Sequence, residues 1–157
     1  MTSVPQTGSI SSVLALQEAS QLALTIVNVS QKIRRNKAAF NRLANDTSKF
    51  VDDMINYYGI MEGYFPLEVP EDLAVVFQRT VNSLKSSRNF TRNVASRNFF
   101  TAFLFSRSDM NELETHELTL LMNKGSFKMI SNAYIKGLIT KLSAETVEAL
   151  TQRFRAV

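Results

Sequence analysis

The sequence predicts an all-α fold: a four-helix bundle with a short aromatic helix before the fourth helix and a C-terminal accessory helix. The 157 residues include only five glycines and three prolines, which argues against an all-β fold with many turns. Apolar residues recur at helical spacing along most of the chain, and no stretch shows the alternation of a half-buried strand. We therefore expect amphipathic helices around a single core.

The composition indicates one globular domain. A chain of this length can bury a sizeable core, and its hydrophobic fraction of 45% and charged fraction of 20% are ordinary, so extensive disorder is not expected. The absence of cysteine excludes disulfide bonds and thiolate metal sites. The N-terminus lacks the basic start and apolar run of a secretory signal, so the cytoplasm is the expected location.

The N-terminal part of the chain divides into a tail and a first helix. Residues 1–12 are small and polar and are expected to form a flexible tail. The bundle is expected to span residues 13–131. From Val13 onward, the following apolar residues recur at helical spacing: Leu16, Ala19, Ala23, Ile26 and Ile33. Glutamine, serine and threonine are too frequent here for a transmembrane helix, so we interpret this stretch as a core helix rather than a membrane-inserting one.

The second and third helices show regular apolar stripes. A helix over residues 36–58 is predicted from the stripe Phe40, Leu43, Ala44, Thr47, Val51, Met54, Ile55 and Tyr58. Glycines and prolines at 59, 63, 66 and 70 then indicate a loop. The third helix begins near Pro70, with two acidic residues in its first turn. Its apolar face consists of Leu73, Val76, Phe77, Thr80, Val81 and Leu84.

The stretch "SRNFFTAFLFSRSD", residues 96–109, concentrates aromatic residues between two arginines. On a helix, Phe99, Phe100, Phe103 and Leu104 fall within an arc of about 140°, so we expect them to form a buried plug against the bundle. Phe105 lies outside this arc. It is therefore either ordinary surface or an anchor for a partner, which is a second copy of the bundle or a membrane interface.

The fourth helix is predicted to begin at Asp109, which stands three residues before Glu112 as in a capping box. Its apolar residues Leu113, Leu120, Phe127 and Tyr134 follow at heptad spacing. Gly125 and Gly137 weaken the helix, so residues 132–157 are expected to form the separate accessory segment.

The net charge of +4 is unevenly distributed. Residues 31–49 and 73–107 are basic, whereas residues 50–72 carry acidic side chains without a basic one. This alternation fits either helices whose solvated faces attract one another, or a basic face for an anionic partner. The candidate contacts to lipid or to a partner are Arg34, Arg35, Lys37, Arg88, Arg92, Arg97, Phe105 and Arg107.

No motif indicates catalysis. The one histidine, His116, stands four residues before Leu120 and is expected at the edge of the core between helices. Asp52 and Asp53 are adjacent and would point to different sides of a helix, which suits solvent rather than acid–base chemistry. The chain contains no glycine-rich phosphate loop, no HExxH motif and no nucleophile elbow. We predict a protein without enzymatic activity, cofactor or metal.

Two motifs resemble those of fungal domains that are similar to the N-terminal four-helix bundle of the mixed lineage kinase domain-like pseudokinase and related to HeLo domains. The first comprises Ser96, Arg97, Phe99, Phe100, Phe103, Leu104, Ser108 and Asp109. The second comprises Asn36, Lys37, Leu43 and Ala44, with Phe40 where the family commonly has cysteine. The chain departs from the family at Thr101 and Ala102, which replace basic residues, and in two extra residues between Leu104 and Ser108.

The resemblance, over about residues 13–131, implies a cytosolic signalling and cell-death-type bundle that self-assembles and associates with membranes on activation. The leading hypothesis is thus a self-associating bundle that targets or permeabilises membranes that carry anionic lipids. The alternative is an adaptor that binds another helical signalling protein and no lipid. Nucleic-acid binding has the basic pI of about 9.5 in its favour but no recognisable motif, and it is the least expected.

Overall fold

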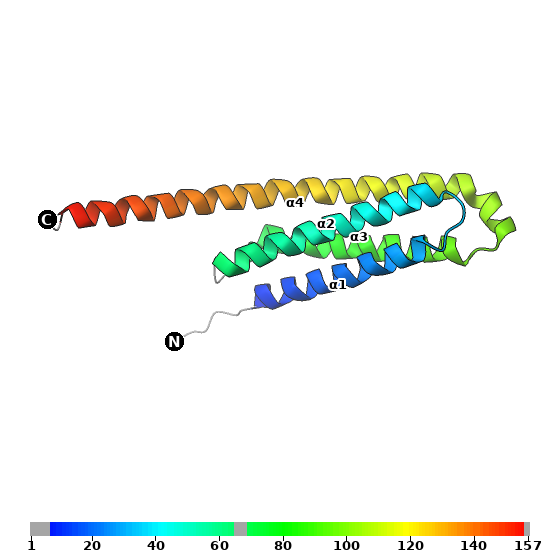
Figure 1. Cartoon of the computed structure of the whole chain (residues 1–157), viewed down its shortest axis with the longest axis horizontal. Coiled ribbons are helices and arrows are strands. Elements are labelled where there is room, and N and C mark those ends of the chain that lie inside the picture. Colours follow the sequence, from blue (N-terminus) through cyan, green and yellow to red (C-terminus); the bar gives the residue numbers. More distant parts are fainter. Residues whose placement is uncertain (1–6, 65–68, 156–157) are drawn as a thin grey trace.

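The computed structural model describes residues 7–64 and 69–155, and this part of the chain forms four helices and no strand. They are α1 (Thr7–Ser30), α2 (Lys37–Tyr64), α3 (Glu71–Ser96) and α4 (Phe99–Arg155). Figure 1 shows α1, α2, α3 and the first half of α4 lying side by side, while α4 projects beyond them toward the C-terminus. The predicted all-α, four-helix architecture is confirmed.

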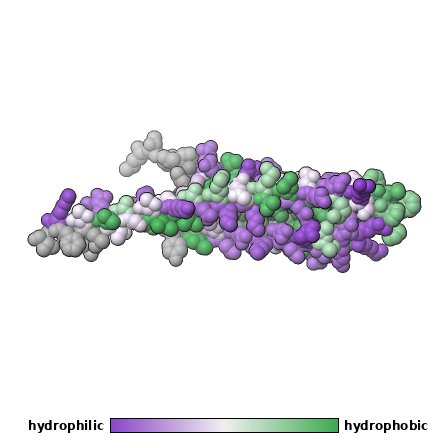
Figure 2. All heavy atoms as spheres, turned by 90° about the horizontal axis from the view of Figure 1, so that it is seen from above, coloured by the Kyte–Doolittle hydropathy of each residue, from purple (hydrophilic) through white to green (hydrophobic). Residues whose placement is uncertain are grey.

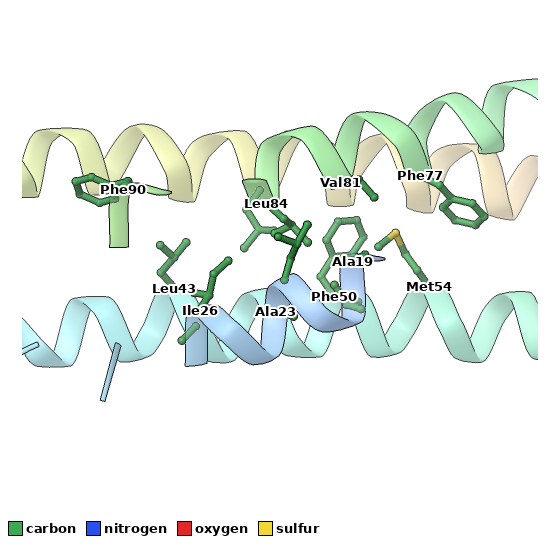
Figure 3. Close-up of a cluster of buried hydrophobic side chains, with 14 of the residues drawn as sticks. Ala19, Ala23, Ile26, Leu43, Phe50, Met54, Phe77, Val81, Leu84 and Phe90 are labelled. Atoms are coloured by element: carbon green, nitrogen blue, oxygen red, sulfur yellow. The ribbon is translucent and has the colours of Figure 1, made fainter. Parts of the chain in front are cut away.

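The core lies between the predicted apolar stripes (Figure 3). The predicted positions that lie in α1 and α3 are all buried, as is Ile33 in the turn after α1, and the stripe of α2 is buried from Phe40 to Met54. At the last turn of the α2 stripe, Ile55 is exposed and Tyr58 is only partly buried. The largest fully buried side chains are Phe40, Phe50, Phe77, Ile26, Leu43, Met54, Leu84 and Leu113.

Helix α4 enters this core through Leu113, Leu120 and Phe127. The ring of Phe127 meets those of Phe50 and Tyr57 edge-on, with centroids 5.8 and 5.4 Å away. Further along, every side chain described from residue 139 onward is exposed. With 57 residues and a rise of about 1.5 Å per residue, α4 is about 85 Å long and exceeds the bundle that it packs against.

Three predicted element boundaries are wrong. Helix α1 begins at Thr7, so residues 7–12 are helical rather than a flexible tail; residues 1–6 lie outside the described residues. The single helix α4 replaces the predicted aromatic, fourth and accessory helices. Gly125 and Gly137 do not interrupt it, because each costs only about 1 kcal/mol of helix stability. Gly59 and Gly63 likewise lie within α2, and Pro66 lies outside the described residues.

Candidate functional site: the aromatic–basic end of the bundle

Two turns far apart in the sequence meet at the end of the bundle opposite to the C-terminus (Figure 1). Asn36 in the α1–α2 turn has a φ of 54°, a left-handed conformation that asparagine tolerates better than most residues. Its carbonyl oxygen accepts hydrogen bonds from the N–H groups of Ala39 and Phe40 and so begins α2. Its Nδ2 donates to the backbone oxygen and to Oγ of Ser106, each at 3.4 Å. Asn36 therefore joins the α1–α2 turn to the start of α4.

The first two turns of α4 expose their apolar side chains at this end. Phe99, Phe100, Phe103 and Leu104 are between 60 and 73% exposed, so the prediction of a buried plug is wrong. The periodicity correctly places them on one helix face, but α4 begins beyond the ends of the other helices (Figure 1), so no helix packs against that face. Helix α4 first reaches the interior at Asp109 and Leu113. Phe105, expected outside the plug, is 47% exposed and the least exposed of the five.

Two arginines lie over these rings. The guanidinium of Arg35 stands 4.5 Å from the ring centroid of Phe103 and 5.5 Å from that of Phe99. That of Arg97 stands 4.9 Å from the ring of Phe105. Cation–π contacts of this kind contribute about 0.5–1 kcal/mol at exposed sites. They favour this arrangement of the rings at the bundle end.

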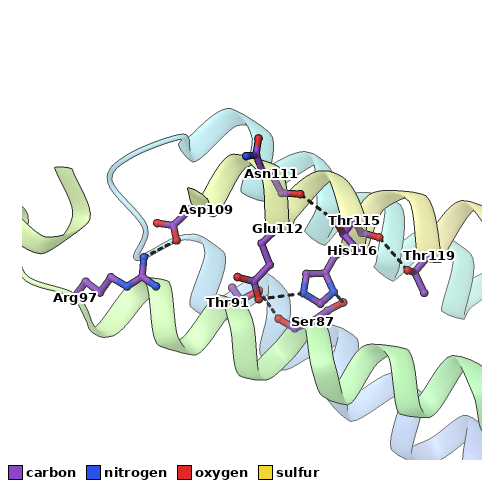
Figure 4. Close-up of polar contacts among 9 residues, drawn as sticks. All are labelled: Ser87, Thr91, Arg97, Asp109, Asn111, Glu112, Thr115, His116 and Thr119. Carbon is purple, nitrogen blue, oxygen red and sulfur yellow. Dashed lines mark hydrogen bonds and ion pairs between the residues drawn. The ribbon is translucent and has the colours of Figure 1, made fainter. Parts of the chain in front are cut away.

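Arg97 also forms an ion pair with the buried carboxylate of Asp109 (Figure 4). Asp109 was predicted to begin a helix, but it lies inside α4, where its carboxylate forms the ion pair with Arg97. The side chain that begins α4 is Asn98, whose Oδ1 accepts hydrogen bonds from N and Oγ1 of Thr101 at 2.9 Å. This is the geometry of a helix N-cap.

The remaining predicted contacts divide into two groups. Arg34 and Lys37 are exposed in and beside the α1–α2 turn, and Arg107 is exposed on α4 next to Ser106, which Asn36 contacts. These three residues join Arg35, Arg97 and Phe105 at this end. Arg88 and Arg92 are set back on α3 by eight and four residues from its last residue, about 12 and 6 Å. We name the first group, together with Phe99, Phe100, Phe103 and Leu104, the aromatic–basic end.

The sequence reasoning missed two features of this end. It assigned the plug residues to the core, and it gave no role to Asn36 beyond its place in a motif. A usable signal was present, because the aromatic run is bracketed by Arg97 and Arg107 rather than by apolar residues. Charged residues on both sides of an aromatic segment favour exposure of that segment to solvent.

His116 lies between α3 and α4, as predicted (Figure 4). Its Nδ1 is 3.0 Å from Oγ of Ser87, and its ring stacks on Phe90 with centroids 4.9 Å apart. Burial lowers the pKa of His116 below its ordinary value, and the nearby carboxylate of Glu112 opposes this shift. These contacts join α3 to α4 through the imidazole of His116, whose Nε2 lies 4.0 Å from Oε1 of Glu112.

The described part of the chain holds neither a metal-binding cluster nor a membrane-spanning helix. Among residues 7–64 and 69–155, no three histidine, aspartate or glutamate side chains are grouped so that they could hold a metal ion. Within the same ranges, no helix is long and apolar enough to cross a bilayer. Comparisons with models of known protein families, with curated proteins and with solved structures find no match to this chain.

Proposed function

We propose that this chain is a non-enzymatic signalling bundle that self-associates and that docks on anionic membrane surfaces through its aromatic–basic end. The observation that carries the proposal is the exposure of four large apolar side chains, Phe99, Phe100, Phe103 and Leu104, at one end of the bundle and among basic residues. Figure 2 shows hydrophobic side chains gathered at that end.

The apolar side chains supply the first part of the driving force. Full burial of a phenylalanine or leucine side chain contributes about 1.5–3 kcal/mol, and four exposed ones leave much of this unrealised in water. Aromatic rings settle well at the level of lipid headgroups, where the apolar ring is covered and the backbone stays hydrated. Partial insertion of the first turns of α4 is therefore favourable and needs no membrane-spanning helix.

The basic side chains supply the second part. Arg34, Lys37 and Arg107 are exposed, and each contributes about 1 kcal/mol near an anionic surface. Arg97 contributes less, because its charge is already paired with Asp109. The electrostatic attraction therefore comes mainly from side chains that surround the rings.

The resemblance to fungal domains similar to the pseudokinase N-terminal bundle supports the same proposal. It implies a cell-death-type role, in which a cytoplasmic bundle becomes peripherally membrane-bound on activation. The motif that carries most of the resemblance, residues 96–109, is the segment exposed at the aromatic–basic end.

An adaptor that binds a helical protein and no lipid is the second candidate. The specific observation in its favour is the pre-arranged contact of Arg35 with Phe99 and Phe103. Aromatic and arginine side chains are enriched among the residues that dominate protein–protein affinity. Lipid binding decides between the two candidates.

The test is co-sedimentation with vesicles of phosphatidylcholine alone and with added phosphatidylserine, at low and high salt. We expect binding to the anionic vesicles that weakens with salt, and at least a tenfold loss in the double variant Phe99→Ser/Phe103→Ser. The matched control is Leu14→Ser/Val75→Ser, because both side chains are exposed and lie far from this end. Leu14 stands about 24 Å before the last residue of α1, and Val75 stands about 31 Å before the last residue of α3.

Charge is tested by Arg34→Gln/Arg107→Gln against Arg79→Gln, an exposed arginine in the first half of α3. The first should weaken binding to anionic vesicles and the second should not. Dye release from the same vesicles measures permeabilisation. Equal binding to neutral and anionic vesicles would contradict the proposed preference for an anionic surface, and no binding to either would contradict the proposal and favour the adaptor.

A further inference from the structure

Helix α4 carries a second apolar face, which points away from the core. Leu118, Leu121, Met122 and Met129 are 58 to 68% exposed, and no described residue of the chain covers them. With Gly125 they stand at positions i, i+3, i+4, i+7 and i+11, which is one face of a helix. Figure 2 looks onto the side of the bundle along which α4 runs and shows hydrophobic side chains there among hydrophilic ones. We name these five residues the outer stripe.

The outer stripe differs from scattered surface residues because the opposite face of the same helix is already buried. Leu113, Leu120 and Phe127 supply that buried face over the same turns. A surface helix needs only one apolar face. A helix that is apolar on two faces has a second surface to cover, and contiguous exposed apolar patches mark interaction sites.

The charges along this part of α4 are arranged by sign. Acidic side chains stand at its N-terminal end, at Glu112, Glu114 and Glu117, whereas lysines follow at Lys124, Lys128, Lys136 and Lys141. Glu117 is paired with Arg42, but Glu114 and Lys136 are exposed and have no ion-pair partner among the described residues. They stand eleven residues before and eleven residues after Gly125.

This pattern is complementary to itself in one orientation only. If two copies of α4 pair in parallel, glutamate faces glutamate and lysine faces lysine, which is unfavourable. If they pair antiparallel about Gly125, Glu114 of each copy faces Lys136 of the other, and Leu121 faces Met129. Gly125 lies at the crossing point, where the missing side chain permits close approach; its Cβ position is open, with no atom within 4 Å.

We propose that two copies of this chain associate antiparallel through the outer stripe of α4, with a two-fold axis near Gly125. The arrangement is isologous, so it closes after two copies and leaves both aromatic–basic ends free. Because the two helices run in opposite directions, those ends lie at opposite ends of the dimer. The self-association in the proposed function rests on this surface, whereas membrane docking does not, so experiments without lipid separate the two.

The test is a charge swap followed by sedimentation velocity in the absence of vesicles. Glu114→Lys and Lys136→Glu each place like charges opposite one another twice in the dimer, so each variant alone should dissociate at least tenfold more readily than the parent chain. An equimolar mixture of the two variants pairs lysine with glutamate at both contacts, so it should recover association as a heterodimer. Asp53→Lys, an exposed charge change on α2, is the control and should leave association unchanged.

Two further variants locate the surface. Leu121→Ser/Met122→Ser should abolish association while circular dichroism shows an unchanged fold, because both side chains are exposed in the single chain. Phe99→Ser/Phe103→Ser should leave association intact. The proposal is overturned if the parent chain is monomeric at every concentration, if the mixture of folded charge variants fails to recover association, or if the aromatic variant alone abolishes it.

Discussion

Two phenylalanines of α4 provide the sharpest test of where the core ends. Phe127 is 7% exposed and touches the rings of Phe50, Tyr57 and Phe77, with centroids between 5.4 and 6.3 Å away. Truncation of such a side chain to alanine costs about 3–5 kcal/mol, because the transfer free energy is lost and a cavity remains. Since domains of this kind are stable by about 5–15 kcal/mol, Phe127→Ala should remove a large share of the total.

Phe103→Ala should behave differently, although the residue type and the helix are the same. The side chain is 60% exposed, so less than half of its burial free energy, about 1 kcal/mol, is available to lose. Its contact with Arg35 adds about 0.5 kcal/mol at such an exposed site. The expected total is about 1–1.5 kcal/mol, and no internal cavity forms.

Urea denaturation followed by circular dichroism measures both variants against the parent chain. With a slope of about 2 kcal/mol per molar urea, Phe127→Ala should lower the midpoint by about 2 M and Phe103→Ala by less than about 0.8 M. The slopes must agree among the three proteins for the comparison to hold. Equal shifts in the two variants would refute the reasoning, because they would mean that the start of α4 packs as tightly as its middle.

Further predictions concern polar contacts at the α3–α4 interface. Burial lowers the pKa of His116 in the folded protein, so the unfolded chain takes up this proton at a higher pH. The contribution of His116 to the free energy of unfolding is therefore complete above about pH 7. It is lost as the pH drops through about 6.5, the ordinary pKa of histidine, toward the lower pKa of the folded protein. His116→Gln should flatten this decline in denaturation midpoints measured between about pH 8 and 5, and an unchanged decline would assign it to other groups. Arg97→Gln leaves the buried Asp109 without its ion-pair partner and should cost about 1–3 kcal/mol. In thermal unfolding, the free energy of unfolding of the variant Arg107→Gln, which changes an exposed arginine, should stay within about 0.5 kcal/mol of that of the parent chain. Similar losses in both variants would mean that the ion pair of Arg97 with Asp109 does not stabilise the fold more than an exposed arginine does.

The periodicity of the sequence by itself determined the helical class and the inward faces of α1, α2 and α3. A residue such as Ile26, Leu43 or Val81 recurs with its neighbours every three or four positions, and this spacing is set by the α-helix itself. Each of these stripes faces another helix along its length, so the residues that share a face are also the residues that are buried. Local geometry and tertiary burial agree there, which is why prediction succeeds.

Only the tertiary structure decided that the aromatic residues 99–105 are exposed and that α4 is one continuous helix. Phe99 and Phe103 share a face with the same regularity as Ile26 and its neighbours, yet they are exposed because no helix lies opposite them at the end of the bundle. The pairing of Arg97 with Asp109 and the link from Asn36 to Ser106 join residues 12 and 70 positions apart. Helix periodicity relates residues within a few turns and carries no information about which turns meet in space, so these contacts, and the site that they build, follow from packing alone.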